Sequence, residues 1–76
     1  MNKSRLKYLI NNGTRKELEF ELKSVVEKEV ELLNNRKAKV VGVQRRFEDL
    51  IITLEENGTY TDYMVGEFTL IFERVV

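Results

Sequence analysis

The sequence predicts an α+β fold, with one main helix at about residues 15–34 packed on a three- or four-stranded antiparallel β-meander at about residues 39–75. Apolar residues recur at helical spacing in the first half of the chain, whereas segments rich in β-branched and aromatic residues fill the second half. The helical pattern precedes the strand patterns and does not alternate with them, which is typical of α+β proteins with an antiparallel sheet.

The length of 76 residues predicts a single domain, residues 1–76. A chain of this size is marginally stable unless a disulfide, a metal or oligomerisation supports it. The sequence contains no cysteine and no histidine, so disulfides are excluded and a zinc site is disfavoured. We therefore expect a homo-oligomer.

The tripeptide Asn-Gly-Thr occurs twice, and its first copy, at residues 12–14, precedes the predicted main helix. Thr14 and Glu17 have the spacing of a capping box, which marks a helix start. Asn34 and Asn35 are expected to end the helix, whose apolar stripe consists of Leu18, Leu22, Val25, Val26, Val30 and Leu33.

Two residues do not fit this helix, since Glu29 falls inside the apolar stripe and Phe20 falls opposite it. An alternative explains Phe20 better. In it, residues 3–23 form an N-terminal β-hairpin, a short helix covers residues 25–35, and the meander follows. Ser24 and Glu27 would then form the capping box of the shorter helix.

The second copy of Asn-Gly-Thr predicts a β-hairpin. Asn57 and Gly58 are the preferred pair for a two-residue type I′ turn, in which both residues need a positive φ. Residues 39–46 predict the preceding strand, with Gly42 at a bulge or close approach. The last segment, residues 67–76, predicts a final strand because Phe68, Leu70 and Phe72 alternate with other residues.

The face of the sheet away from the helix is expected to be unusually apolar. A sheet that is covered on one side is normally polar on the other. The predicted registers place four apolar residues there, and we expect either residues 7–10 or a second copy of the protein to cover them: Ile51, Tyr60, Met64 and Ile71.

Charges cancel overall but are sorted along the chain into alternating basic and acidic blocks, an order that favours basic segments lying against acidic ones. One basic block is the best local candidate for binding phosphate, and thus nucleic acid. Phe47 follows this block and is expected in the core, because aromatic residues of strands usually pack. The block contains Arg36, Lys37, Lys39, Arg45 and Arg46.

No group of residues predicts catalysis. Without histidine and cysteine the chain lacks the usual general base and thiol nucleophile, and its four glycines form no phosphate-binding loop. Glu48, Asp49 and Asp62 are the carboxylates closest to a site, but their spacing is that of a solvated strand edge. We therefore expect no enzyme, no catalytic residue, no metal, no cofactor and no small-molecule substrate.

The chain has neither an apolar run of about 20 residues nor the pattern of a signal peptide. We therefore expect a cytoplasmic protein without membrane contact. The predicted function is a small, self-associating, non-enzymatic module that also binds another protein, with nucleic-acid binding through residues 36–46 as the alternative. The size and the Lys/Glu/Asn/Ile-rich composition are typical of accessory or regulatory proteins of phages and mobile elements.

Overall fold

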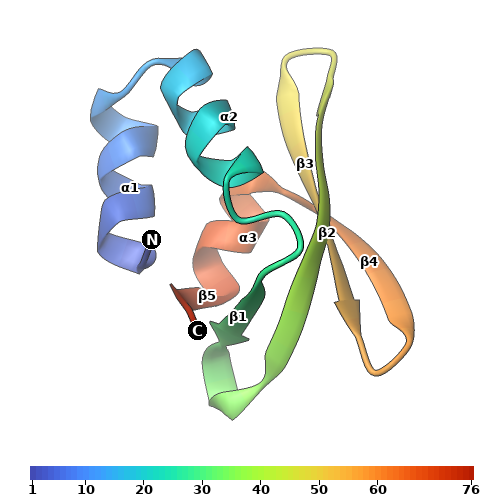
Figure 1. Cartoon of the computed structure of the whole chain (residues 1–76). Helices are drawn as coiled ribbons and strands as arrows, with labels where there is room; N and C mark the ends of the chain where they lie inside the picture. The colour runs from blue at the N-terminus through green and yellow to red at the C-terminus, as the bar shows by residue number, and fades with distance from the viewer.

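The computed structural model describes all 76 residues and shows three short helices on one face of a five-stranded antiparallel sheet (Figure 1). The helices are α1 (Lys3–Asn12), α2 (Arg15–Lys23) and α3 (Val65–Ile71), and a 3₁₀ turn is η1 (Leu33–Asn35). The strands are β1 (Glu29–Leu32), β2 (Lys37–Arg46), β3 (Asp49–Glu56), β4 (Thr59–Met64) and β5 (Phe72–Val75). The α+β class is confirmed, but the single main helix is wrong.

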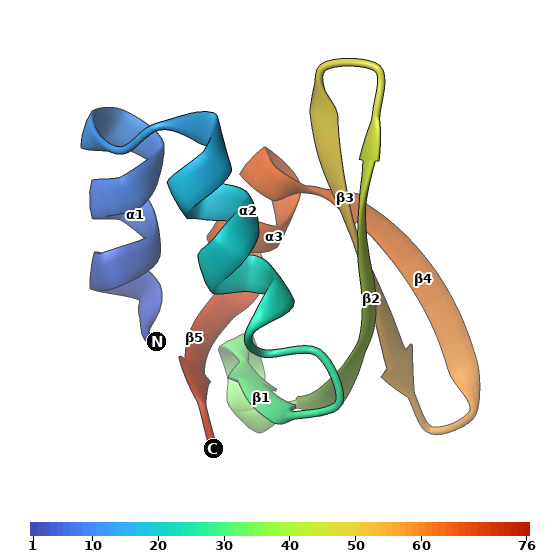
Figure 2. The same ribbon diagram turned by 45° about the horizontal axis from the view of Figure 1, so that its top comes forward.

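The strand order is β4-β3-β2-β1-β5, so the first four strands form a meander and β5 returns to lie beside β1. Figure 2 shows the three helices on the same side of this sheet, with β4 at the far edge. We call the helix-covered side of the sheet the inner face and the opposite side the outer face.

The first Asn-Gly-Thr separates two helices. The Gly13 N–H donates to the Leu9 carbonyl at 2.9 Å, and a Cβ on Gly13 would lie 2.9 Å from that same oxygen. Only glycine fits this close approach. Thr14 then caps α2, since its hydroxyl accepts from the Glu17 N–H at 3.1 Å and the Glu17 carboxylate accepts from the Thr14 N–H at 2.8 Å. The predicted capping box is confirmed.

The predicted main helix ends at Lys23 and does not continue to residue 34. Glu27 has a φ of 74°, outside the helical region, and the chain then enters β1. Val30 and Leu32 alternate with exposed or half-buried residues along β1, so each fills the core from a strand. Val30 favours this extended backbone because it is β-branched. The alternative is wrong too, since residues 3–12 and 15–23 are helical and residues 25–35 are not an α-helix.

The second Asn-Gly-Thr forms the predicted hairpin between β3 and β4. Asn57 and Gly58 have φ values of 52° and 84°, as a type I′ turn requires. The turn predicts four facing pairs, and three of them are confirmed: Glu56 with Thr59, Leu54 with Thr61 and Ile52 with Tyr63. The fourth, Leu50 with Val65, is wrong, because the chain leaves the sheet after Met64 and Val65 begins α3. The bulge predicted at Gly42 is also present, because the β2–β3 register shifts between Val40 and Gly42.

The predicted C-terminal strand is confirmed only at residues 72–75, which form β5, whereas residues 67–71 belong to helix α3. Phe68 and Phe72 are both fully buried, with ring centroids 4.9 Å apart, whereas Leu70 between them is 69% exposed. Two buried residues four positions apart share a helix face, and the residue midway lies on the opposite side. The alternation of Phe68, Leu70 and Phe72 therefore suggested the wrong period.

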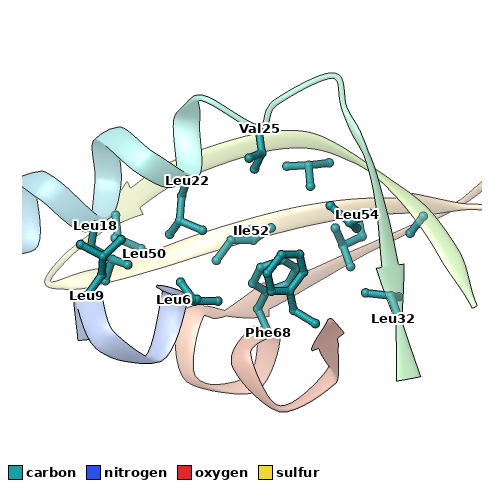
Figure 3. Packing of buried hydrophobic residues seen from close by; sticks show 14 residues of the cluster. Leu6, Leu9, Leu18, Leu22, Val25, Leu32, Leu50, Ile52, Leu54 and Phe68 are labelled. Carbon is teal, nitrogen blue, oxygen red and sulfur yellow. The ribbon is translucent and has the colours of Figure 1, made fainter. Parts of the chain in front are cut away.

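The core lies between the helices and the inner face (Figure 3). Leu6 of α1, Leu22 of α2 and Phe68 of α3 converge on Ile52 of β3, and all four side chains are fully buried. Residues 7–10 belong to α1 and therefore cover the inner face, not the outer one.

Ion pairs join the basic and acidic blocks, as their order predicts. Arg5 of α1 pairs with Glu21 of α2 at 3.4 Å, and Arg45 of β2 pairs with Glu19 of α2 at 2.6 Å. The remaining pairs between different segments are Lys3–Glu73, Arg36–Glu56, Lys39–Glu27 and Arg74–Glu31.

Candidate interaction surface

The outer face of β3 and β4 carries three of the four apolar residues predicted there. Ile51 lies opposite Met64, and Tyr60 lies opposite Glu55. Ile51 is only 8% exposed, while Met64 and Tyr60 are 48% and 67% exposed. Ile71 is misplaced in the prediction, because it lies at the end of α3 and packs against the core from the inner side.

Polar residues interrupt this apolar surface more than the sequence suggested. Thr53 and Asp62 form the pair between the Ile51–Met64 and Glu55–Tyr60 pairs, and the Thr53 hydroxyl donates to the Asp62 carboxylate at 2.6 Å. The outer face is therefore a mixed surface with an aromatic ring and a thioether exposed on β4. The exposed residues Tyr60 and Met64 belong to β4, which is an edge strand of the sheet. No other helix or strand lies beyond this edge (Figures 1 and 2).

The five cations predicted to bind nucleic acid do not form one patch. Arg36 makes a two-pronged contact with Glu56, through Nε at 2.9 Å and Nη2 at 2.7 Å. These hydrogen bonds lower the pKa of Glu56 and, together with a contact from Tyr63, raise the pKa of Arg36. The Glu56 carboxylate therefore already occupies the N–H edge of the guanidinium that would bind a phosphate.

Two more of these cations, Lys39 and Arg45, are also paired with carboxylates. Lys39 contacts Glu27 at 2.9 Å, and this hydrogen bond raises the pKa of the lysine. The Glu19 carboxylate accepts hydrogen bonds from Lys23 at 2.7 Å and from Arg45 at 2.6 Å. Both contacts lower the pKa of this carboxyl, and the contact with Lys23 has the larger effect. The β2 bulge turns Arg45 toward α2, because it changes which alternate residues face inward.

Lys37 and Arg46 make no ion pair, but they lie at opposite ends of β2. Nine residue-to-residue steps of extended chain place their Cα atoms about 30 Å apart. The basic segment is therefore a line of mostly neutralised charges and not a cluster.

Phe47, which was expected in the core, lies on the surface instead. It occupies the two-residue turn between Arg46 and Asp49, where its side chain is 93% exposed and its φ is 58°. A bulky residue at positive φ is uncommon, since glycine and asparagine are favoured there. The turn was missed because it contains no glycine, proline or asparagine. The signal that could have shown it is the run of charges on both sides of the aromatic residue.

The carboxylates considered for catalysis do not form a metal site, since no three of the carboxylates of the chain lie together as potential ligands. Asp49 and Asp62 line the same shallow hollow over Ile51, together with Arg46, Phe47 and residues of β4 and α3. Asp62 is committed to the hydrogen bond from Thr53.

Comparisons with protein-family models, with curated proteins and with solved structures found no match to this chain. None of its helices has the length and apolar character that crossing a membrane requires.

Proposed function

We propose that this protein is a non-enzymatic protein-interaction module that self-associates through the outer face of β3 and β4. The observation that carries the proposal is the exposure of Tyr60 and Met64 on the outer face of β4, beside the edge of the sheet. Tyrosine and methionine are enriched in protein interfaces, where they contribute large contact areas. The small size of the chain and its lack of disulfides also favour stabilisation by association.

Sedimentation velocity over about 1 µM to 1 mM tests this proposal, because weak interfaces have dissociation constants in that range. Tyr60→Ala is expected to raise the dissociation constant about tenfold, as truncation of a central interface aromatic does. Tyr8→Ala is the matched control, since Tyr8 is 57% exposed on α1, away from this face. Equal effects of the two substitutions would contradict the assignment of the surface.

Nucleic-acid binding is a second candidate, supported by the exposure of Phe47. Its ring could stack on an unpaired base, and Arg46 beside it is free to contact phosphate. Arg15 adds a cation, since it lines a shallow hollow together with Arg45, Phe47 and Glu48. Glu48 and Asp49 at the same tip oppose phosphate, which makes this candidate the weaker one.

Fluorescence anisotropy with a labelled single-stranded oligonucleotide at low and high salt tests this candidate. Phe47→Ala should weaken binding at least fivefold, because stacking on one base contributes about 1–3 kcal/mol. Phe20→Ala is the matched control, since Phe20 is 75% exposed on α2. Absence of binding at low salt would eliminate this function.

A further inference from the structure

The two edges of the sheet differ in how they are protected. At the β5 edge, Asn2 forms a bridge with Arg74, and the Val75 N–H donates to the Met1 carbonyl at 3.0 Å. No strand or terminal segment covers β4, which is the other edge (Figures 1 and 2). Proteins usually guard an open edge with proline, a bulge or charged side chains, lysine above all. β4 has no proline, lysine or bulge, and Asp62 is its only charged residue.

The hairpin register shows which backbone groups of β4 face outward. In a hairpin with a two-residue turn, the pair that flanks the turn exchanges hydrogen bonds, and every second pair after it does so too. Glu56 and Thr59 flank the turn, so Thr59 and each second residue after it bond to β3. The N–H and C=O groups of Tyr60, Asp62 and Met64 therefore point away from the sheet.

One hydrogen bond in the structure supports this assignment. The Met64 N–H donates to the Glu67 carboxylate at 2.9 Å, so it does face away from β3 and is already satisfied. Met64 is also the N-cap of α3, a position whose carbonyl accepts the first hydrogen bond of the helix. The open groups of the edge are then the N–H and C=O of Tyr60 and of Asp62, and strand pairing is the way in which such groups are usually satisfied.

We infer that β4 pairs antiparallel with β4 of a second copy, about a two-fold axis at Thr61. This inference rests on the self-association proposed above and specifies its geometry. Tyr60 then lies opposite Asp62 of the partner subunit, and Asp62 lies opposite Tyr60 of the partner subunit. Each such pair exchanges two hydrogen bonds, so all the open backbone groups of both edges are used.

The neighbouring registers leave groups unpaired or set like charges together. If Asp62 faced Asp62 of the partner subunit, two carboxylates would be adjacent, and Tyr60 would face Met64, whose N–H is already bonded. If Tyr60 faced Tyr60 of the partner subunit, Asp62 would face Gly58, whose N–H donates to the Glu55 carboxylate at 2.9 Å. Only the register centred on Thr61 avoids both faults.

The side chains suit a second copy in this register. Thr61 faces its own counterpart, and paired threonines are favourable across antiparallel strands. The outer faces of the two subunits become continuous, so Tyr60 of each copy lies next to the outer face of the other. A two-fold contact of this kind uses the same surface on both partners, which is the usual form of a homodimer.

Single-cysteine variants test the register directly, because the chain has no cysteine of its own. At a non-hydrogen-bonded pair the two Cα atoms lie about 4.5 Å apart, within the range that a disulfide spans. Thr61→Cys is therefore expected to form a disulfide-linked dimer under mild oxidation. Thr59→Cys is the matched control on the same face of β4, since its counterpart would lie about 13 Å away, four residues further along.

Asp62→Cys tests the competing register, in which residue 62 would lie opposite residue 62 of the partner subunit. In the register centred on Thr61 the two Cα atoms are diagonal neighbours about 7–8 Å apart, too far for a disulfide. We expect Thr61→Cys to cross-link at least tenfold faster than Thr59→Cys or Asp62→Cys, as measured by non-reducing gel electrophoresis. Equal rates, or faster cross-linking of Asp62→Cys, would overturn the inference.

A proline substitution tests the role of the edge backbone. Asp62→Pro removes an N–H that faces solvent in the monomer, a position where an edge strand tolerates proline. Asp62→Ala is the matched control, because it removes the same carboxylate and keeps the N–H. Asp62→Pro should raise the dimer dissociation constant at least tenfold relative to Asp62→Ala in sedimentation equilibrium, with circular dichroism verifying the fold.

The outcomes separate this inference from the proposed function. A wild-type chain that stays monomeric at about 1 mM refutes the self-association together with the edge pairing, and leaves a strand of another protein to occupy the edge. A wild-type dimer that Asp62→Pro does not weaken refutes the edge pairing alone. If Asp62→Pro fails to fold, the comparison of cysteine variants decides.

Discussion

The helical state of residues 65–71 makes a sharp prediction about two neighbouring apolar residues. Phe68 is fully buried and stacks on Phe72, whereas Leu70 is 69% exposed. Phe68→Ala should therefore be severely destabilising, and Leu70→Ala should have little effect. If this segment were a strand, the two residues would share one face and both substitutions would be costly.

The magnitudes follow from burial. Replacing a fully buried phenylalanine by alanine costs about 3–5 kcal/mol, because the lost transfer free energy and the remaining cavity add. A domain of 76 residues is expected to have an unfolding free energy of about 4–11 kcal/mol, so Phe68→Ala removes much of it. Leu70→Ala should change the unfolding free energy by less than about 0.5 kcal/mol, as exposed substitutions usually do.

Urea unfolding followed by far-ultraviolet circular dichroism measures both values. With a slope of about 1 kcal/mol per molar urea, Phe68→Ala should lower the midpoint by about 3 M or more. If that variant is unfolded without urea, Phe68→Leu gives a measurable loss, because it retains part of the buried side chain. A loss of more than about 2 kcal/mol in Leu70→Ala would refute the helical assignment, since only a buried leucine has that effect.

Four further substitutions test local features. Gly58→Ala should lower the unfolding free energy measured in urea by about 1 kcal/mol, because the φ of 84° is unfavourable for a residue with a Cβ. Gly42→Ala should be neutral or stabilising, because its Cβ would meet no atom within 4 Å. A larger loss in Gly42→Ala than in Gly58→Ala would contradict the turn assignment. Thr14→Ala should lower the unfolding free energy by about 1 kcal/mol through loss of the cap of α2, and an unchanged midpoint would count against the capping box. Arg36 holds the pKa of Glu56 below its ordinary value of 4.5, so this pair stabilises the fold above that pH and the stabilisation is lost as the pH falls through the lowered pKa. Arg36→Ala should therefore flatten the decline of stability in acid, and an unaltered pH profile would show that the pair contributes nothing.

Short-range features were predictable because their causes lie within a few residues. The turn at Asn57 and Gly58, the capping box that starts at Thr14 and the bulge at Gly42 were all predicted correctly. Each depends on backbone sterics or on hydrogen bonds between close neighbours in the sequence. The hairpin register followed from the turn, because turn length fixes which residues face each other.

Segments with two compatible periods were not predictable in this way. The apolar residues of 25–33 fit a helical stripe, yet Val30 and Leu32 also alternate as a strand requires. The same ambiguity affected Phe68 and Phe72, which fit either a strand or one face of a helix. Intrinsic propensities are too small to decide such cases, so the packing partners decide them.

In the candidate surface, too, features set by nearby residues were predicted, and contacts between distant residues were not. Tyr60 and Met64 were placed on the outer face correctly, because the register of β4 follows from its turn. Ile71 was misplaced with the segment that turned out to be α3. The pairing of Arg36, Lys39 and Arg45 with specific carboxylates depends on residues distant in the sequence, so only the folded chain shows that these cations are not free.

The sequence by itself determined the turn at Asn57 and Gly58, the start of α2 at its capping box, and how β3 and β4 face each other. The tertiary structure decided that residues 29–32 form a strand, that residues 3–12 and 65–71 are helices, and that β4 is left as the open edge. The physical reason is that turns and caps are satisfied locally, whereas an apolar segment takes the conformation in which its neighbours bury it.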